Sequence, residues 1–415
     1  MLAVRVGTVV GIWACGWCAY YAIQEAVRLA VLRCRCARYP LPAPSPDGDW
    51  HGTADEPERR AIVAHFGALK FLGRYLNVTP EWREQGMWEW AYWKLVHSLV
   101  TLRVGWDGGL ARDRRTAHGC ERLEQLLPVH ALDHEHLWDP ATVSRGITYT
   151  WIGQSTCLIQ LNGVTILTDP VFGDQPIESM LSPRRMRPMP CTIEDIAPHI
   201  DVVLVSHNHY DHLDLTVIPH LAHAQWIMPT GTRNLVRGIA AANVHELSWW
   251  SEATLDITCR NAGGSHRGLS VAAVPANHWS TRTLLDTNTS LWNSYAVRVD
   301  DASLFFCGDS GYSDSLFTAI GRMYGPFDLA TIPIGSYAPR WHLSMQHMDP
   351  YGSVRVAQRI GARQSFGMHW GTWCMSDERW DAPPHDLALA LKREQRPAHF
   401  LRTVAFGKTE YVRTG

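Results

Sequence analysis

The chain has 415 residues, of which 46% are hydrophobic and 19% charged, so a coiled coil and a long disordered tract are excluded and a core can form without disulfide support. With 38 Lys and Arg against 40 Asp and Glu, the net charge of −2 excludes the strongly basic surface of a typical nucleic-acid-binding protein, and we predict no nucleic-acid partner. The ten cysteines are mostly isolated, and we interpret them as reduced thiols of a protein that faces the cytosol. A secreted disulfide framework is the weaker alternative.

The first element in chain order is an uncharged apolar run of 17 residues, 7–23. This length is the lower limit for a membrane-spanning helix, and the arginines that follow would keep the rest of the chain on the cytosolic side. We therefore predict that residues 1–39 form an apolar helix that serves as a membrane anchor or targeting segment. Shallow insertion into the lipid interface and a cleaved leader are the alternatives.

Residues 40–55 are rich in proline, glycine and polar residues and are predicted to be a linker. The next stretch, 56–145, is predicted to be a helical extension. One helical pattern opens at Pro57 and continues to Leu76. A second pattern, over Trp88–Val100, carries four aromatic side chains, which favours packing in a core over contact with lipid.

From residue 146 to the end, apolar runs that suit strands alternate with helical patterns, which is typical of a layered α/β architecture. The expected strands are 147–151, 156–161, 164–168, 201–206, 269–274, 294–299, 304–307, 329–334 and 365–368, with a two-residue turn at Asn162-Gly163. The expected helices are 216–222, 231–241, 351–359 and 385–393.

Four side chains that can bind a metal follow directly after the buried strand 201–206: His207, His209, Asp211 and His212. Imidazole and carboxylate groups suit zinc or iron, and a tight loop after a strand can turn alternate side chains toward one point. The alternative is a solvated polar loop, which four strong ligands within six residues make improbable.

Two neighbouring metals need further ligands, and candidates lie just past later predicted strands. These candidates are His278, Asp309 and His369. Each residue alone is more often a hydrogen-bonded core side chain, but three of them at strand ends favour a shared site.

The pattern H-x-H-x-D-H, followed by His278, Asp309 and His369, resembles the metallo-β-lactamase superfamily. The segments SHNHYDHLD, TDPVF, GPFDLATIPIGSYAPRW and QHMDP resemble more specifically the family of N-acylphosphatidylethanolamine-hydrolysing phospholipases D. The resemblance runs from about residue 148 to residue 373. It implies an αββα sandwich for a catalytic domain at 146–415, and a possible homodimer.

The resemblance also implies an activity, namely cleavage of N-acylphosphatidylethanolamine to N-acylethanolamine and phosphatidic acid at a membrane surface. The alternatives are another hydrolase on this scaffold, such as a lactonase or a non-lipid phosphodiesterase, and a membrane scaffold without catalysis. No H-x-K occurs in the chain, so a covalent phosphohistidine route has no support.

The resemblance implies two Zn²⁺ ions per chain. One ion would bind His207, His209 and His278, the other would bind Asp211, His212 and His369, and Asp309 would bridge both. Asp309 and His347 would be the catalytic side chains.

Other residues correspond to supporting positions of the family. Tyr210 and His347 match positions that contact substrate, with packing over the metal loop and helix capping as the alternatives. Asp169 resembles the acid that orients a ligand histidine, with a strand-capping turn as the alternative. Relatives commonly have histidine where this chain has Gln154, a position outside the expected ligands.

A cluster of arginines, Arg184, Arg185 and Arg187, is a candidate for contact with anionic lipid. An exposed loop with internal salt bridges is the equally weighted alternative.

Overall fold

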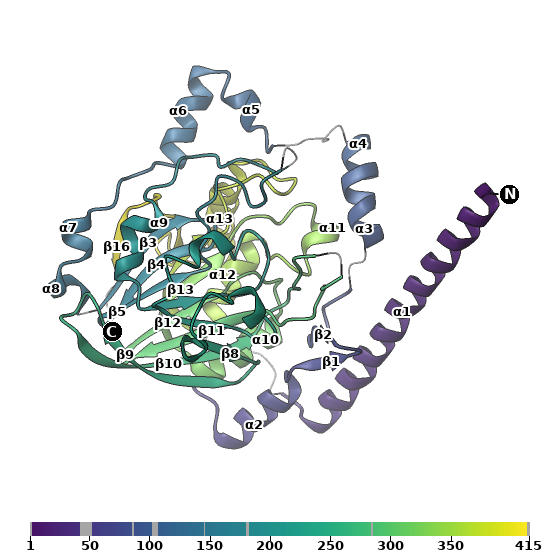
Figure 1. The fold of residues 1–415 in the computed structure, drawn as a ribbon, viewed down its shortest axis with the longest axis horizontal. Helices are drawn as coiled ribbons and strands as arrows, with labels where there is room; N and C mark the ends of the chain where they lie inside the picture. Colours follow the sequence, from purple (N-terminus) through teal and green to yellow (C-terminus); the bar gives the residue numbers. More distant parts are fainter. Residues whose placement is uncertain are drawn as a thin grey trace.

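The computed structural model describes residues 2–41, 52–84, 87–101, 107–144, 146–179, 182–283 and 285–412. Two seven-stranded sheets form the body of the protein (Figure 1). Most of the predicted linker, residues 42–51, lies outside the described residues.

The first sheet has the strand order β16-β3-β4-β5-β6-β7-β8. Its strands are β3 (Ile147–Gly153), β4 (Thr156–Leu161), β5 (Val164–Thr168), β6 (Val202–Leu204), β7 (Gln225–Pro229), β8 (Val244–Leu247) and β16 (Thr409–Val412). The half from β16 to β5 is antiparallel, and the half from β5 to β8 is parallel.

The second sheet has the order β15-β14-β13-β12-β11-β10-β9. Its strands are β9 (Glu252–Cys259), β10 (Ser265–Pro275), β11 (Asn293–Val299), β12 (Ala302–Phe306), β13 (Phe327–Pro333), β14 (Ala362–Met368) and β15 (Leu401–Arg402). Strands β9 to β12 pair antiparallel, and β12 to β15 pair parallel.

Side chains along each strand alternate between the two faces of the sheet, and this alternation explains why the two sheets stack. On β4, Cys157 and Ile159 point into the main core between the sheets, while Leu158 points into a second core on the outer face. Across the main core, the ring of Tyr149 on β3 stacks on that of Phe366 on β14, with centroids 4.4 Å apart. Burying both inner faces removes a large apolar area from water, which stabilises the sandwich.

Helices cover the outer faces, which completes the αββα sandwich that the resemblance implied. The outer core of the first sheet includes Ile193 and Ile196 of α9 (Ile193–Ile196). On the second sheet, α12 (Pro350–Arg359) packs on β13 and β14, flanked by α10 (Asp314–Tyr324) and α13 (Ala382–Arg393).

The topology of the second sheet brings three strand ends to one edge. Strands β12 and β14 run in the same direction, because each pairs parallel with β13. Strand β11 runs opposite to β12, and β10 runs opposite to β11, so β10 has the same direction as β12. The residues that follow these three strands therefore emerge at a common edge, close to the loop that follows β6.

The N-terminal region begins with one long helix, α1 (Leu2–Arg38), whose first part extends away from the body in Figure 1. Its second half docks through Arg28, a fully buried residue that donates hydrogen bonds to the carbonyl oxygens of Thr79 and Trp82 at 2.8 Å each. Within the described residues, no helix has the length and hydropathy that a membrane span requires.

Residues 56–145 contain a small hairpin in addition to the helices of the extension that we predicted. Helix α2 (Glu56–His65) stops eleven residues before Leu76, and a small hairpin follows, β1 (Leu69–Phe71) and β2 (Arg74–Leu76). The positive φ angles of Leu72 and Gly73, 45° and 82°, form the hairpin turn and are incompatible with a continued helix. The remaining helices are α5 (Leu110–Asp113), α6 (Ala117–Leu126), α7 (His134–Leu137) and α8 (Pro140–Val143).

Residues 87–100, named here the aromatic segment, form α3 (Met87–Ala91), a π-helical stretch (Tyr92–His97) and α4 (Ser98–Val100). The prediction that its aromatic residues pack in a core holds for Trp93, which is 4% exposed, and is wrong for Trp88, Trp90 and Tyr92, which are about half exposed. Trp93 attaches the segment to the body, since its Nε1 donates to Asp377 Oδ2 at 3.1 Å.

The helix predicted over 231–241 is also wrong. In this stretch the structure has a short 3₁₀ turn, Arg233–Leu235, and the start of a second one, Ala241–Asn243. Helices α12 and α13 agree with the predictions for 351–359 and 385–393.

Candidate metal centre

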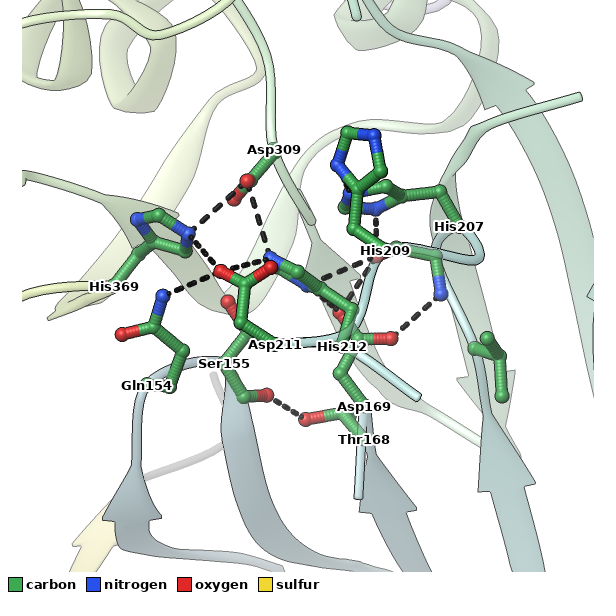
Figure 2. Close-up of polar contacts among 12 residues, drawn as sticks. Gln154, Ser155, Thr168, Asp169, His207, His209, Asp211, His212, Asp309 and His369 are labelled. Carbon is green, nitrogen blue, oxygen red and sulfur yellow. Dashed lines mark hydrogen bonds and ion pairs between the residues drawn. The ribbon is translucent and has the colours of Figure 1, made fainter. Parts of the chain in front are cut away.

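The loop after β6 carries four of the predicted ligands into the edge where β10, β12 and β14 end. His278, Asp309 and His369 follow those strands, and all seven predicted ligands lie together. Figure 2 labels each of them except His278. Ligand atoms fall into two groups, each with all atoms within 4.8 Å of one another: His207, His209 and His278, and Asp211, His212, Asp309 and His369.

A glycine allows the two loops to approach. Gly308 has a φ of 59°, and a Cβ at this position would lie 2.6 Å from the Cβ of Ser206. Only glycine fits this combination of backbone conformation and contact, and the approach sets Asp309 beside the loop that follows β6.

The first group consists of three imidazoles. His209 Nδ1 lies 2.8 Å from His207 Nε2 and 3.3 Å from His278 Nε2. Burial lowers the pKa of His209 to about 4 and that of His278 to about 3. Both rings are therefore neutral near pH 7, which is the form of histidine that binds a metal.

The second group mixes carboxylates and imidazoles. Burial alone would raise the pKa of Asp211 and lower that of His369, but the attraction of Asp211 to His212 and that of His369 to Asp309 outweigh burial. The pKa of Asp211 is held well below its usual range, and that of His369 is raised to about 9.

Asp309 lies between the two groups. Its Oδ2 is 3.1 Å from His212 Nε2 and 3.0 Å from His369 Nε2, and it is 3.9 Å from His278 Nε2 of the other group. A carboxylate in this position can reach ions in both groups.

Several buried polar atoms of the cluster have no hydrogen-bond partner among the described residues. They are His209 Nε2 and Asp309 Oδ1, whereas His212 Nε2 and His369 Nε2 form ion pairs with Asp309 Oδ2 and no hydrogen bond. An unpaired buried polar atom is costly, and inward-facing imidazole nitrogens and carboxylate oxygens are the ligand types that suit a divalent transition metal such as zinc. The donor set therefore fits metal binding better than a purely structural hydrogen-bond network.

Asp169 supports the ligands from behind, fully buried at the end of β5. Its Oδ2 is 2.6 Å from His212 Nδ1 and accepts a hydrogen bond of 2.6 Å from Ser206 Oγ. The same Ser206 hydroxyl lies 2.9 Å from His207 Nδ1. One carboxylate thus orients a histidine of each group, directly for His212 and through Ser206 for His207.

His347 lies against the cluster, with Nδ1 3.8 Å from Asp309 Oδ2 and its ring 5.1 Å from that of His278. It forms a third possible ligand group with His278 and Asp309. The helix-capping alternative is wrong, because Asp349 is the residue that caps α12, through Gly352 N.

The side chain of Tyr210 is held by Arg282. Its hydroxyl donates to the carbonyl oxygen of Arg282 at 2.6 Å, and the Arg282 guanidinium lies over its ring at 4.2 Å. Tyr210 is only half-buried, so a substrate group could still reach this ring from the surface.

The contacts of the arginine cluster favour an exposed loop with internal salt bridges over a site for anionic lipid. Arg184 forms an ion pair with Asp174 at 2.6 Å. Arg185 donates to the carbonyl oxygens of Gly173 and Val171, and its guanidinium lies 4.5 Å from the ring of Trp373.

Sequence reasoning missed two polar residues that brace the ligands. Asn77 clamps the backbone of His278, donating to its carbonyl oxygen at 2.7 Å and accepting from its N–H at 3.2 Å. Ser206 links Asp169 to His207. A hydrophobic pattern carries no signal for either residue, although the position of Ser206 directly before the ligand motif was a usable hint.

Comparison with known proteins agrees with this geometry. A model described as the Beta-lactamase superfamily domain matches residues 164–370. Among solved structures, the isothiocyanate hydrolase from Delia radicum gut bacteria superposes with a TM-score of 0.50 at 16% identity, covering 65% of this chain and 100% of that one. This likeness supports the fold alone.

Two curated relatives are more specific. The mitochondrial N-acyl-phosphatidylethanolamine-hydrolyzing phospholipase D of Saccharomyces cerevisiae is 33% identical over 363 residues, which cover 80% of this chain and 74% of that protein. N-acyl-phosphatidylethanolamine-hydrolyzing phospholipase D 1 of Caenorhabditis elegans is 35% identical over 279 residues, which cover 65% of this chain and 75% of that protein. With this degree of identity over most of both relatives, the chain belongs to the N-acylphosphatidylethanolamine-hydrolysing phospholipase D family of the β-lactamase superfamily.

Proposed function

We propose that this protein is a zinc-dependent hydrolase of the phospholipase D type, which cleaves N-acylphosphatidylethanolamine to N-acylethanolamine and phosphatidic acid at a membrane surface. The names of the two relatives support the substrate class. The single observation that carries the proposal is the convergence of seven metal-binding side chains, with unpaired inward-facing donors, at one edge of the sandwich.

In this proposal one Zn²⁺ is held by His207, His209 and His278, the other by Asp211, His212 and His369, and Asp309 reaches both. When bound, such a pair of ions supplies a hydroxide near neutral pH and neutralises negative charge on phosphate oxygens. The net reaction adds water across one P–O bond, so that the phosphate remains on the diacylglycerol and the N-acylethanolamine leaves with a hydroxyl group.

The chain's own residues would fix the geometry of this reaction. Asp169 holds the rings of His212 and His207 in place, and Asn77 holds the backbone of His278. His347 lies close enough to the cluster to donate a hydrogen bond to an oxygen of the phosphate or of the leaving group. These contacts restrict where a phosphodiester could bind, which is how orientation lowers a barrier.

The aromatic segment supports the membrane surface as the place of action. Leu95, Leu99 and Val100 are 67%, 63% and 76% exposed, an unusual concentration of large apolar side chains on one short helix. Such a face is suited to insertion among lipid acyl chains.

This apolar face is connected to the metal cluster through α11 (Arg340–Leu343). The ring of Tyr92 in the aromatic segment contacts that of Trp341 in α11, with centroids 5.7 Å apart, and Trp341 is itself 46% exposed. Arg340 donates to the carbonyl oxygen of His347 at 2.9 Å. A bilayer on the aromatic segment would therefore be held near the residue that we assign to substrate contact.

The test offers the purified full chain three substrates in parallel: vesicles that contain N-acylphosphatidylethanolamine, a lactone and an RNA. Zinc is quantified in the same preparation. We expect about two zinc ions per chain, as a dinuclear site requires, release of N-acylethanolamine and phosphatidic acid, and loss of activity after chelation that is restored by zinc.

Hydrolysis of only the lactone or the RNA would replace the lipid substrate by one of the alternative activities. Absence of bound metal and of all hydrolysis would favour a scaffold without catalysis. Asp309→Asn protein serves as the control for contaminating lipase.

A further inference from the structure

Gln154 is fully buried in the turn between β3 and β4 and contacts two predicted ligands of the second group. Its side-chain Nε2 donates to Asp211 Oδ2 at 2.9 Å. Its backbone carbonyl oxygen accepts the N–H of His369 at 3.0 Å. Figure 2 shows the amide nitrogen aimed at the Asp211 carboxylate.

The backbone at this point is fixed independently of the side chain. Gln154 N donates to Thr372 Oγ1 at 2.6 Å, and Trp151 Nε1 donates to the carbonyl oxygen of Gln154 at 2.9 Å. Gln154 and His369 both have positive φ angles, 52° and 60°. Because backbone atoms make these bonds, a substitution of the Gln154 side chain removes the bond to Asp211 and leaves the turn in place.

The side-chain amide of Gln154 bonds to one oxygen of Asp211, and that oxygen has other polar neighbours. Asp211 Oδ2 also lies 3.4 Å from His212 Nε2 and 3.4 Å from His369 Nε2. An amide N–H is a neutral donor at every accessible pH and cannot itself bind a metal cation. It can therefore restrain the carboxylate without competing for the ion.

We propose that Gln154 is a positioning residue for the second ligand group, in which its side-chain amide restrains the Asp211 carboxylate and its carbonyl oxygen restrains the backbone of His369. The first group has no contact with Gln154 among the hydrogen bonds of the described residues. Gln154 therefore tunes metal binding in one half of the centre. The inference rests on the proposed metal centre and does not depend on the lipid substrate.

The test measures zinc affinity directly, by titrating metal-free protein against a chromophoric chelator. For Gln154→Met, which has a similar length and no donor, we expect one of two binding steps to weaken by about 10–100-fold, the usual effect of losing a partner of a ligand. The other step should stay within about threefold of the wild-type value. Gln154→His, which can present an N–H at a similar reach, should recover most of the lost affinity.

Gln160 provides a matched control on the neighbouring strand. It is equally buried, its Nε2 donates to the carbonyl oxygen of Leu137 at 2.7 Å, and its Oε1 accepts from Thr148 Oγ1 at 2.7 Å, away from the cluster. Gln160→Met should therefore lower thermal stability without changing either zinc-binding step.

Unchanged zinc affinity in Gln154→Met would overturn the inference, and so would equal weakening of both steps or equal losses in the Met and His variants. If Gln154→Met does not fold, Gln154→Asn replaces it, because its amide is one methylene too short to reach Asp211 and the same loss is expected. If the wild-type protein binds two zinc ions and does not cleave the lipid, the proposed function is wrong. The zinc-affinity test of Gln154 can still be carried out in that case.

Discussion

The metal cluster and the aromatic segment are opposite in character although α11 connects them. The cluster is a set of buried polar side chains at the ends of sheet strands, and several of its atoms have no partner among the described residues. The aromatic segment is a short helix with exposed apolar side chains, attached to the body through Trp93. In the proposed function, catalysis and recognition of the membrane surface fall on separate structural elements, so each should be removable without the other.

The largest effect is expected from a substitution that removes catalysis and leaves vesicle binding intact. Asp309→Asn eliminates the negative charge between the two ligand groups, and we expect turnover to fall by about 10³-fold or more, since loss of one central electrostatic group commonly costs at least 10²-fold. Vesicle binding should be unchanged in a sedimentation assay. Loss of vesicle binding by this variant would show that the two regions are not separable.

A smaller loss is expected at His347, which lies against the cluster and near α11. His347→Ala should slow lipid cleavage by about 10²-fold, in the range for loss of one hydrogen-bonding or acid–base group, while zinc content stays unchanged. Turnover and metal content are measured on the same sample. Loss of one zinc would instead identify His347 as a ligand, as its grouping with His278 and Asp309 allows.

The converse experiment should weaken binding to the membrane surface and leave catalysis unchanged. Leu95→Ser combined with Leu99→Ser should reduce vesicle binding by about 10²-fold, because two leucines would no longer transfer into the bilayer. Cleavage of a short-chain, micelle-free substrate should stay at the wild-type rate. Leu389→Ser is the matched control, since Leu389 is also more than half exposed but lies on α13. An equal effect of the control would show that the aromatic segment is not the docking face.

The smallest effect concerns a buried carboxylate outside both regions. Asp201 precedes β6, at the opposite end of the strand from His207, and burial raises its pKa from 3.8 to about 6. The folded state then keeps a proton that the unfolded state releases, so the free energy of unfolding falls as the pH rises from about 4 to 6, by on the order of 1–3 kcal/mol.

Asp201→Asn should lack this dependence, which urea unfolding of both proteins at pH 4 and pH 6.5 would measure. Turnover at neutral pH should be unaffected. A parallel pH response of the two proteins would show that Asp201 titrates normally, and a large loss of turnover would extend the site beyond the cluster.

Local patterns predicted much of the sandwich. The strands at 156–161 and 164–168 and their Asn162-Gly163 turn were predicted with the bounds that the structure has, because alternating residues and turn chemistry are short-range signals. Strand β9 escaped prediction because it is an edge strand with mostly exposed residues and no continuous apolar run. The helix expected up to Leu76 failed because the turn at Leu72 and Gly73 overrides a helical spacing of apolar residues.

For the site, position at strand ends predicted which side chains would converge, since the topology of an α/β fold sends those residues to one edge. The bond from Gln154 to Asp211 and the clamp of Asn77 on His278 were not predictable, because they join residues 57 and 201 positions apart through side-chain geometry. The exposure of Trp88 and Trp90 was also misjudged, because an aromatic helix has the same pattern whether its partner is a core or a bilayer.

The pairing of β16 with β3 has a consequence for biosynthesis. The first sheet obtains its edge strand only when residues 409–412 have left the ribosome, after every ligand of the metal cluster has been translated. Until then β3, the strand that leads into Gln154, has one unpaired side. A nascent chain therefore presents all the predicted ligands before the sheet is complete, and a truncation that removes only β16 would leave them on a scaffold without its edge strand.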